Sequence, residues 1–308
     1  MSITILGFAV LAVALAAAGC RQAAQAPVEK VPDTEAPALR VGYMICDGLD
    51  ESRKRFEPLT RYLEQRTGIR MEAVYLNTFE VPEAFERGEL DITHTNSLLY
   101  IIMHEKGLLP LAGEKRGEMG SMSAGGIAVK ADSPIRTLQD LRGRRMIFGP
   151  QLAPTGFLAQ YELLLDAGVD PELDLDYYAI PAGSYKHEKV VYGVWMGAYD
   201  AAAVPLLDIE LMIRDGRIGP EDLRIIARSD AIPYCVFGAS PRVPEETLGK
   251  VRSALMNILP GDTVAVGPEV HSVLGDAQVD GFVPIEDGDF DRVRAMARKT
   301  NMPPYQEY

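Results

Sequence analysis

Residues 39–45 read Leu-Arg-Val-Gly-Tyr-Met-Ile, and residues 56–67 read Phe-Glu-Pro-Leu-Thr-Arg-Tyr-Leu-Glu-Gln-Arg-Thr, followed by Gly68. The first stretch is short and apolar, which predicts a buried strand. The second places apolar residues at the i, i+3, i+4 spacing of an amphipathic helix, and a glycine is a typical helix end. Together they predict a strand followed by a helix, which is the first part of a βαβ unit.

The same alternation continues along the chain. Two sets of such units, each of about domain size, indicate an α/β protein with two lobes and largely parallel sheets. Further strands are predicted at residues 71–76, 90–93, 145–149, 176–180, 200–204 and 223–227, and further helices at 81–87, 97–106, 155–167 and 187–196.

Two glycine-containing apolar strands enclose the second set of units, at residues 123–130 and 233–240. We interpret them as the two crossings between lobes. The first lobe is then discontinuous, with residues 39–124 joined by residues 238–308, and residues 125–237 form the second lobe. Open α/β sheets bind ligands outside the carboxyl ends of their strands, so the cleft between the lobes is the predicted binding site. Closure about the hinge is the expected motion.

The chain begins with the apolar run MSITILGFAVLAVALAAAGC at residues 1–20. We interpret residues 1–19 as a lipoprotein signal peptide and Cys20 as a lipidated cysteine, with a flexible tether over residues 20–38. A retained membrane anchor is the alternative, but the run is shorter than the ~20 residues that span a bilayer. The mature protein is therefore expected in the bacterial periplasm, anchored to a membrane by its lipid.

The composition excludes several functions. A net charge of −13 argues against nucleic acid as a partner, because such proteins concentrate Lys and Arg on one face. Three cysteines are too few for a disulfide framework. The chain has no GxSxG, Walker, HExxH or strand-following GxGxxG motif, so we expect neither an enzyme nor a cofactor.

Several local motifs carry a family resemblance. They are Arg40-Val41-Gly42-Tyr43, the helix at residues 56–64, the helix, glycine and Asp-Ile strand at 85–93, Ser-Pro-Ile-x-x-Leu-x-Asp-Leu-x-Gly at 133–143, and Lys186-His187-Glu188. These stretches resemble the phosphate, phosphite and phosphonate-binding (PhnD-like) family of ABC-transporter solute-binding proteins. The resemblance implies a type II periplasmic-binding fold, a monomer, a small oxyanion ligand and an ABC permease as partner.

In that family the anion lies at the N-terminus of the first helix of the second lobe, where backbone amides and the helix dipole favour negative charge. The corresponding residues are Ala153-Pro154-Thr155-Gly156. Pro154 has no N–H group, so Thr155 and Gly156 are the implied ligand contacts of this loop. His187 matches the pocket histidine of the family.

Other candidate contacts follow from the predicted strand ends. Tyr43 and Cys46 end the first strand, and His94 and Asn96 end the third, so all four are expected in the cleft. With Met44, Asp47 and Cys235 they raise the alternative of a soft-metal or metalloid site. No known metal motif is present, so no metal site is assigned. A disulfide between Cys46 and Cys235 stays open.

Because Pro154 has no N–H group, the loop at residues 153–156 offers fewer hydrogen-bond donors to an anion, and other functions stay open as well. The same fold, with more apolar wall, would suit a sterol or other lipid, or a metalloid. A ligand sensor that works with a histidine kinase in place of a permease is a further alternative, and nothing in the sequence separates sensing from transport.

Overall fold

The computed structural model describes residues 37–46, 48–181 and 187–307. The predicted signal peptide, Cys20 and nearly all of the tether lie outside the described residues, as do Asp47 and Lys186. Within the described part of the chain, no helix is long and apolar enough to cross a membrane.

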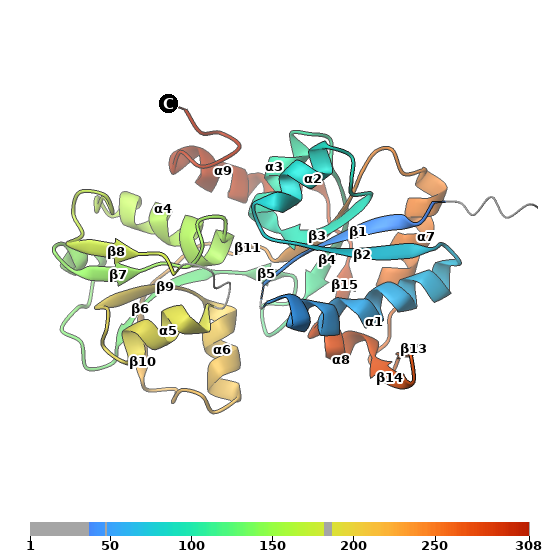
Figure 1. The fold of residues 1–308 in the computed structure, drawn as a ribbon. Coiled ribbons are helices and arrows are strands. Elements are labelled where there is room, and N and C mark those ends of the chain that lie inside the picture. Colours follow the sequence, from blue (N-terminus) through green and yellow to red (C-terminus); the bar gives the residue numbers. More distant parts are fainter. Residues whose placement is uncertain (1–36, 47, 182–186, 308) are drawn as a thin grey trace, which may run out of the picture. The chain divides into compact units, whose positions relative to one another are not determined.

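The first lobe is built on a six-stranded sheet with strand order β15-β4-β12-β3-β1-β2 (Figure 1). Its α-helices are α1, α2, α3, α7, α8 and α9. The elements in chain order are β1 Leu39–Met44, α1 Leu49–Thr67, β2 Met71–Leu76, α2 Glu80–Glu86, β3 Ile92–Asn96, α3 Ser97–His104, β4 Leu109–Lys115, β12 Cys235–Ala239, α7 Glu245–Met256, β13 Thr263–Val266, β14 Glu269–Ser272, α8 Val273–Ala277, β15 Gly281–Val283, a 3-10 helix Asp287–Phe290 and α9 Asp291–Lys299.

The second lobe is built on a five-stranded sheet with strand order β10-β6-β9-β7-β8. Its elements are β6 Gly125–Lys130, a 3-10 helix Leu138–Leu141, β7 Arg145–Ile147, a π-helical turn Pro154–Leu158 that continues into α4 Ala159–Asp166, β8 Tyr177–Ala179, α5 Glu188–Trp195, β9 Ala201–Pro205, α6 Leu206–Arg214 and β10 Leu223–Arg228. This confirms the predicted α/β class, with β-strands and helices at nearly all the predicted positions.

The chain passes between the sheets twice, through two very short strands. These are β5 (Met122–Ser123) and β11 (Ile232–Pro233), which pair with each other antiparallel. The predicted return to the first lobe at residue 238 comes too late in the chain. Strand β12 begins at Cys235, and it pairs with β3 from Cys235↔Asn96 onward, so residues 235–237 already belong to the first sheet.

The prediction of largely parallel sheets is wrong for about half of the strands. The βαβ units do give parallel pairs, namely β1 with β2 and β3, and β7 with β8 and β9. Each crossing, however, returns the chain in the opposite direction. Strand β12 is therefore antiparallel to β3 and β4, and β6 is antiparallel to β9 and β10.

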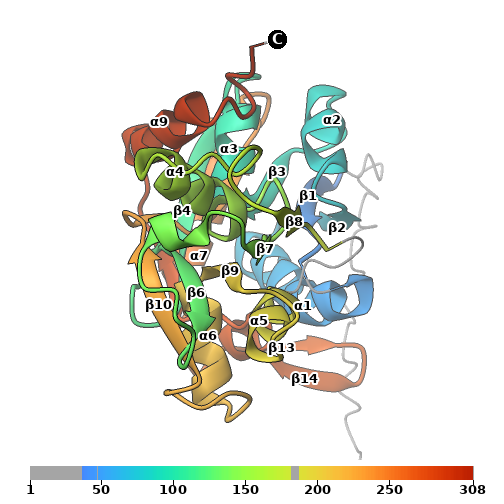
Figure 2. The same ribbon diagram turned by 90° about the vertical axis from the view of Figure 1, so that its left-hand side faces the viewer.

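The two lobes also contact each other through α9, which packs against α3 of the first lobe and α4 of the second (Figures 1 and 2). Arg292 of α9 donates to both carboxylate oxygens of Glu162 on α4, one of them at 2.9 Å, and to Asp230 before β11 at 2.7 Å. The Glu162 side chain is only 5% exposed. Nearby, Leu152 and Leu158 of the second lobe share an apolar cluster with α3 residues.

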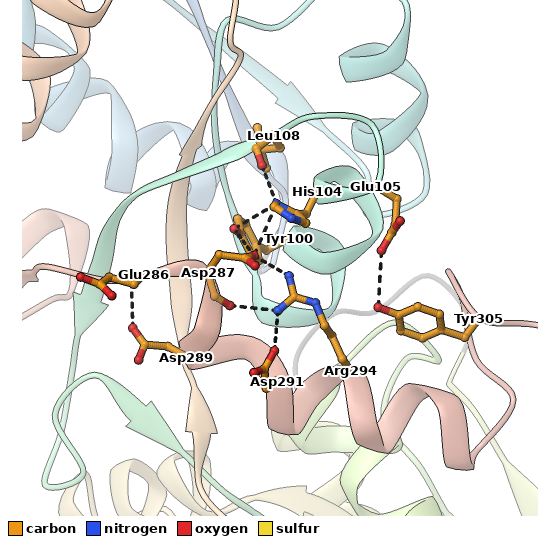
Figure 3. Close-up of polar contacts among 10 residues, drawn as sticks. All are labelled: Tyr100, His104, Glu105, Leu108, Glu286, Asp287, Asp289, Asp291, Arg294 and Tyr305. Atoms are coloured by element: carbon orange, nitrogen blue, oxygen red, sulfur yellow. Dashed lines mark hydrogen bonds and ion pairs between the residues drawn. The ribbon is translucent and has the colours of Figure 1, made fainter.

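A partly buried polar network holds α9 to α3 on the first-lobe side (Figure 3). The Tyr100 hydroxyl donates to Asp287 Oδ1 at 2.9 Å, and Arg294 Nη1 donates to the Asp287 carbonyl at 2.9 Å and to Asp291 Oδ1 at 3.0 Å. Burial by itself would raise the pKa of Asp287, but hydrogen bonds from Arg294 and Tyr100 hold it below its ordinary value. The carboxylate is therefore ionised at neutral pH, and it fixes the start of α9 against α3.

Arg292→Ala tests the contact between α9 and the second lobe. The substitution leaves the buried Glu162 carboxylate without its guanidinium partner, so we expect the free energy of unfolding to fall by on the order of 3 kcal/mol. Arg87→Ala is the matched control, because Arg87 pairs with the exposed Glu83 and Glu89, and it should change the stability far less than Arg292→Ala does. Urea unfolding measures both, and equal losses would contradict the assigned role of Arg292.

Candidate ligand-binding cleft

A cavity with a volume of about 700 Å³ lies between the two sheets. Its walls come from the ends of β1, β3, β4 and β12, from α1 and from both crossing strands, together with the loop after β7 and the starts of α5 and α6. Five of the predicted contact residues line it, namely Cys46, His94, Asn96, Thr155 and His187. Tyr43 and Gly156 do not.

His94 and Glu114 form a buried pair beneath the first-lobe wall of the cavity. His94 Nε2 and Glu114 Oε2 are 2.6 Å apart, and the two side chains are 6% and 1% exposed. Burial by itself would raise the pKa of Glu114, but the hydrogen bond with His94 and the charges of Arg55 and Arg116 hold that pKa below its ordinary value. The floor of the cleft thus contains an ionised carboxylate that requires positive neighbours.

The sheet register explains why these side chains meet. On the central strands His94 is paired with Phe237 and with Tyr43, so the imidazole lies on the same face of the sheet as these rings. Its ring centroid is 4.9 Å from that of Phe56 and 4.7 Å from that of Phe237. The aromatic contacts fix the ring of His94 against the sheet.

Two thiols reach the cavity from the ends of the two strands on either side of β3, and they are not joined to each other. Cys46 follows β1 and Cys235 begins β12. Burial raises the pKa of Cys235 well above its ordinary value, and the charges of Glu114 and Cys46 add to this rise. Cys235 is therefore a protonated thiol at neutral pH. The disulfide that the sequence left open is not formed in this structure.

Two arginines that the sequence analysis did not single out also line the first-lobe wall. Arg55 is 6% exposed and donates from Nε to the Ala277 carbonyl at 3.2 Å. Arg116 follows β4, and it donates to the Tyr234 hydroxyl at 3.4 Å and to Gln278 Oε1 at 3.2 Å. Arg55 could have been found from the sequence, because it stands one residue before the amphipathic helix predicted from Phe56. Arg116 could not, because the strand that it follows, β4, was not predicted.

On the second-lobe side, the loop after β7 leads into the π-helical turn that begins at Pro154. The amides of Thr155 and Gly156 belong to the first turn, where a helix has no internal acceptor for them. The Gln160 amide holds the turn in place, because its Nε2 donates to the carbonyls of Thr155 at 2.6 Å and Val204 at 3.0 Å. Thr155 itself is 8% exposed and lines the cavity.

His187 lies directly over this loop. A β-carbon placed on Gly156 would be 2.3 Å from His187 Cε1, and one placed on Gly149 would be 2.8 Å from it. Both positions therefore require glycine as long as the imidazole stays where it is. Gly156 thus contributes to the site by leaving room for the His187 ring. The buried His187 Nδ1 has no hydrogen-bond partner among the described residues.

Asn96 connects the two lobes at the edge of the cavity. Its Nδ2 donates to the Leu152 carbonyl of the second lobe at 3.0 Å, and its Oδ1 accepts from Leu99 N at 2.9 Å, which caps α3. The amide is therefore already used on both sides. Asn96 lines the cleft, as predicted, but its hydrogen bonds position α3 and the second-lobe loop.

The predicted ligand contact by Tyr43 is wrong. The side chain is 0% exposed, and its ring stacks on that of Phe56 with centroids 4.6 Å apart. Its hydroxyl is 2.8 Å from Thr60 Oγ1. Because side chains alternate along a strand, Tyr43 turns toward α1 and the core, whereas Met44 at the end of β1 and Ile45 and Cys46 after it line the cavity.

Comparison with known proteins agrees with this geometry. The profile of the family described as ABC transporter, phosphonate, periplasmic substrate-binding protein matches residues 42–290. The Phosphate-import protein PhnD of Mycolicibacterium smegmatis is 23% identical over 293 residues, covering 91% of this chain and 90% of that protein. The structure of PhnD1 from Prochlorococcus marinus in complex with methylphosphonate superposes with a TM-score of 0.71 at 17% identity, covering 86% of this chain and 98% of that one.

A second relative belongs to a different functional class. The tetrathionate sensor histidine kinase TtrS of Salmonella typhimurium is 25% identical over 233 residues, which cover 70% of this chain but only 39% of that protein.

The matches define a two-lobed periplasmic binding protein of the type II fold. The chain belongs to the phosphonate-binding family of periplasmic substrate-binding proteins of ABC transporters. This is a family of binding and transport proteins.

Tyr43 and its neighbour Tyr75 allow a test of the core assignment, because their rings are stacked 5.8 Å apart. Tyr43→Phe removes the hydrogen bond to Thr60 and should lower the free energy of unfolding by about 1 kcal/mol. The Tyr75 hydroxyl is buried without a partner among the described residues, so Tyr75→Phe should be neutral or stabilising.

Burial raises the pKa of Tyr75 to about 12. A pKa that is raised in the folded state contributes stability below about pH 10, and this contribution is lost as the pH rises toward 12. Tyr75→Phe should therefore also reduce the loss of stability over that interval. Chemical unfolding at pH 8 and pH 11 measures both effects, and a destabilised Tyr75→Phe protein at pH 8 would contradict the argument.

Proposed function

We propose that the protein binds a small phosphorus oxyanion, of the phosphonate, phosphite or phosphate type, in the cleft and delivers it to an ABC permease. The observation that carries the proposal is the pairing of two kinds of anion-binding group across one cavity. Arg55 and Arg116 contribute guanidinium groups from the first lobe, and the helix start at Thr155 contributes amides and a hydroxyl from the second.

An anion held between these groups would contact both lobes at once. Its binding free energy would then favour the closed arrangement, in which the Asn96 bond to Leu152 is already formed. His187 and Gly156 complete the second-lobe side of the site, and Cys46 and His94 form part of the opposite wall.

The cavity size favours a phosphonate with an organic substituent over bare phosphate. A volume of about 700 Å³ is within the range of about 300–1,000 Å³ that is typical of pockets for organic ligands. Apolar lining residues such as Leu152, Leu207 and Pro233 give an organic group surface to pack against. We propose a binding role without catalysis, for a protein that is a monomer.

Sensing is the second candidate function, and the similarity to the TtrS sensor kinase favours it. In that case the same cleft would report its ligand to a histidine kinase. A lipid, sterol or metalloid ligand is the alternative on the ligand side. Both alternatives predict different outcomes in the experiments below.

A thermal-shift screen of the full chain tests the ligand class. At a hundred times its dissociation constant a ligand adds about 2.7 kcal/mol to stability, which raises the melting temperature measurably. We expect a shift with methylphosphonate, phosphite or phosphate. His187→Ala and Thr155→Ala should each weaken the affinity roughly tenfold or more, because each removes a hydrogen bond to a charged ligand.

Tyr43→Phe is the control variant for that experiment and should keep the affinity of the unmodified protein. A response to a sterol or to arsenite, with none to the phosphorus compounds, would overturn the ligand class. Unchanged affinity in both the His187 and the Thr155 variants would remove these residues from the site.

We propose that Cys20 carries a lipid that anchors the protein to a membrane. Cys20→Ser should release the protein from the membrane fraction without changing its ligand affinity, because a soluble cleft does not need the anchor. Fractionation and binding assays measure the two properties. A Cys20→Ser variant that stays with the membrane would show a different anchor.

Deletion of the gene separates sensing from transport. Loss of a transcriptional response to the ligand, without loss of ligand uptake, would favour sensing.

A further inference from the structure

A metal-binding constellation lies at the first-lobe floor of the cleft, and the oxyanion proposal does not use it. One ring nitrogen of His94, one carboxylate oxygen of Glu114 and the Cys235 sulfur all lie within 4.8 Å of one another. Imidazole, carboxylate and thiolate are the three ligand types that Zn²⁺ accepts from proteins. No other such group of three is present in the described part of the chain.

The three residues come from three adjacent strands of one sheet. Strand β12, which carries Cys235, lies between β3 with His94 and β4 with Glu114. The register places Cys235 opposite Asn96, two residues beyond His94, and places Val236 opposite Gly113. A site on central strands is held more rigidly than one on loops, and the aromatic contacts of His94 add to this rigidity.

The carboxylate has an unused coordination position. Glu114 Oε2 is bonded to His94, but Oε1 is buried with no hydrogen-bond partner among the described residues, although the side chain is only 1% exposed. A buried carboxylate oxygen without a hydrogen-bond partner is costly, and a bound cation would satisfy it. Ser123 Oγ, which lines the same cavity, is likewise buried without a partner.

The cluster is accessible from the cleft. His94 and Cys235 line the cavity, whereas Glu114 lies behind them. An ion that enters through the cavity would therefore meet the imidazole and the sulfur first. Three protein ligands would leave the fourth position of a tetrahedral ion open toward the cavity, where water can occupy it.

We propose that His94, Glu114 and Cys235 form a binding site for a thiophilic divalent transition-metal ion of the Zn²⁺ type. On binding, a ring nitrogen of His94 and a carboxylate oxygen of Glu114 donate lone pairs to the ion, and the thiol proton of Cys235 leaves to solvent as the sulfur bonds to the ion. The thiolate selects a thiophilic ion over Mg²⁺ or Ca²⁺. This site does not depend on the identity of the oxyanion.

Cobalt titration of the metal-free full chain tests the site, because a Co²⁺ ion bound by a thiolate absorbs in the near ultraviolet. We expect one Co²⁺ per chain with a thiolate band, and displacement of the band by Zn²⁺. Cys235→Ser should abolish the band. Glu114→Gln, which keeps the shape of the side chain, should weaken the metal affinity by ~10-fold or more.

Cys46→Ser is the matched control, because it removes a thiol outside the cluster, and it should keep the band. Far-UV circular dichroism and the melting temperature establish that each variant is folded. Should Glu114→Gln fail to fold, the Cys235→Ser and Cys46→Ser pair still decides the matter. Absence of a thiolate band in the unmodified chain, its persistence in Cys235→Ser, or its loss in Cys46→Ser would overturn the proposed ligand set.

Discussion

The buried carboxylate of Glu114 is the constraint on which the rest of the cleft depends. An ionised carboxylate removed from water is strongly unfavourable unless positive or hydrogen-bonding groups surround it. The chain meets this requirement with His94 from a neighbouring strand and with the guanidinium groups of Arg55 and Arg116. In a protein with a net charge of −13, this single requirement concentrates positive charge at the floor of the cavity.

The same constraint connects the core to the cleft. The ring of His94, which bonds to Glu114, packs among the rings of Phe56, Phe237 and Tyr43 on one face of the sheet. Tyr43 thus supports the site without touching it. Across the cavity the corresponding support comes from Gln160, whose amide fixes the helix start at Thr155, and from the two glycines beneath His187. Each wall is therefore positioned by residues that do not reach the ligand.

Much of the fold could be predicted from sequence periodicity. The apolar run at residues 39–45 predicted β1 to within one residue of its end, and the spacing at residues 56–67 predicted the second part of α1, which begins earlier, at Leu49. Local patterning and burial agree in both places. The direction of β12 and its place between β3 and β4 could not be predicted. They depend on pairing between residues far apart in the sequence, such as Cys235 with Asn96, and on crossings that involve only the short strands β5 and β11.

The candidate site was predicted in part, for the same reason. Cys46, His94, Asn96, Thr155 and His187 follow strands or begin helices, and this position places them in the cavity. The predicted ligand contact by Tyr43 was wrong because this residue lies one position before the end of β1 and its side chain faces the core. Arg116 and Glu114 were missed because β4 was not predicted, although its residues are apolar enough to be buried in part.

The arginines also account for the altered anion loop. Pro154 removes one amide donor and Ala153 carries no hydroxyl, so the helix start alone offers a weak site for an oxyanion. Two guanidinium groups on the opposite wall can take over the charge that the loop no longer balances, since their hydrogen bonds to an anion are charge-assisted and stronger than those of neutral hydroxyls. Under the proposed function, the first lobe would supply most of the charge recognition, and Thr155 and His187 of the second lobe would orient the ligand.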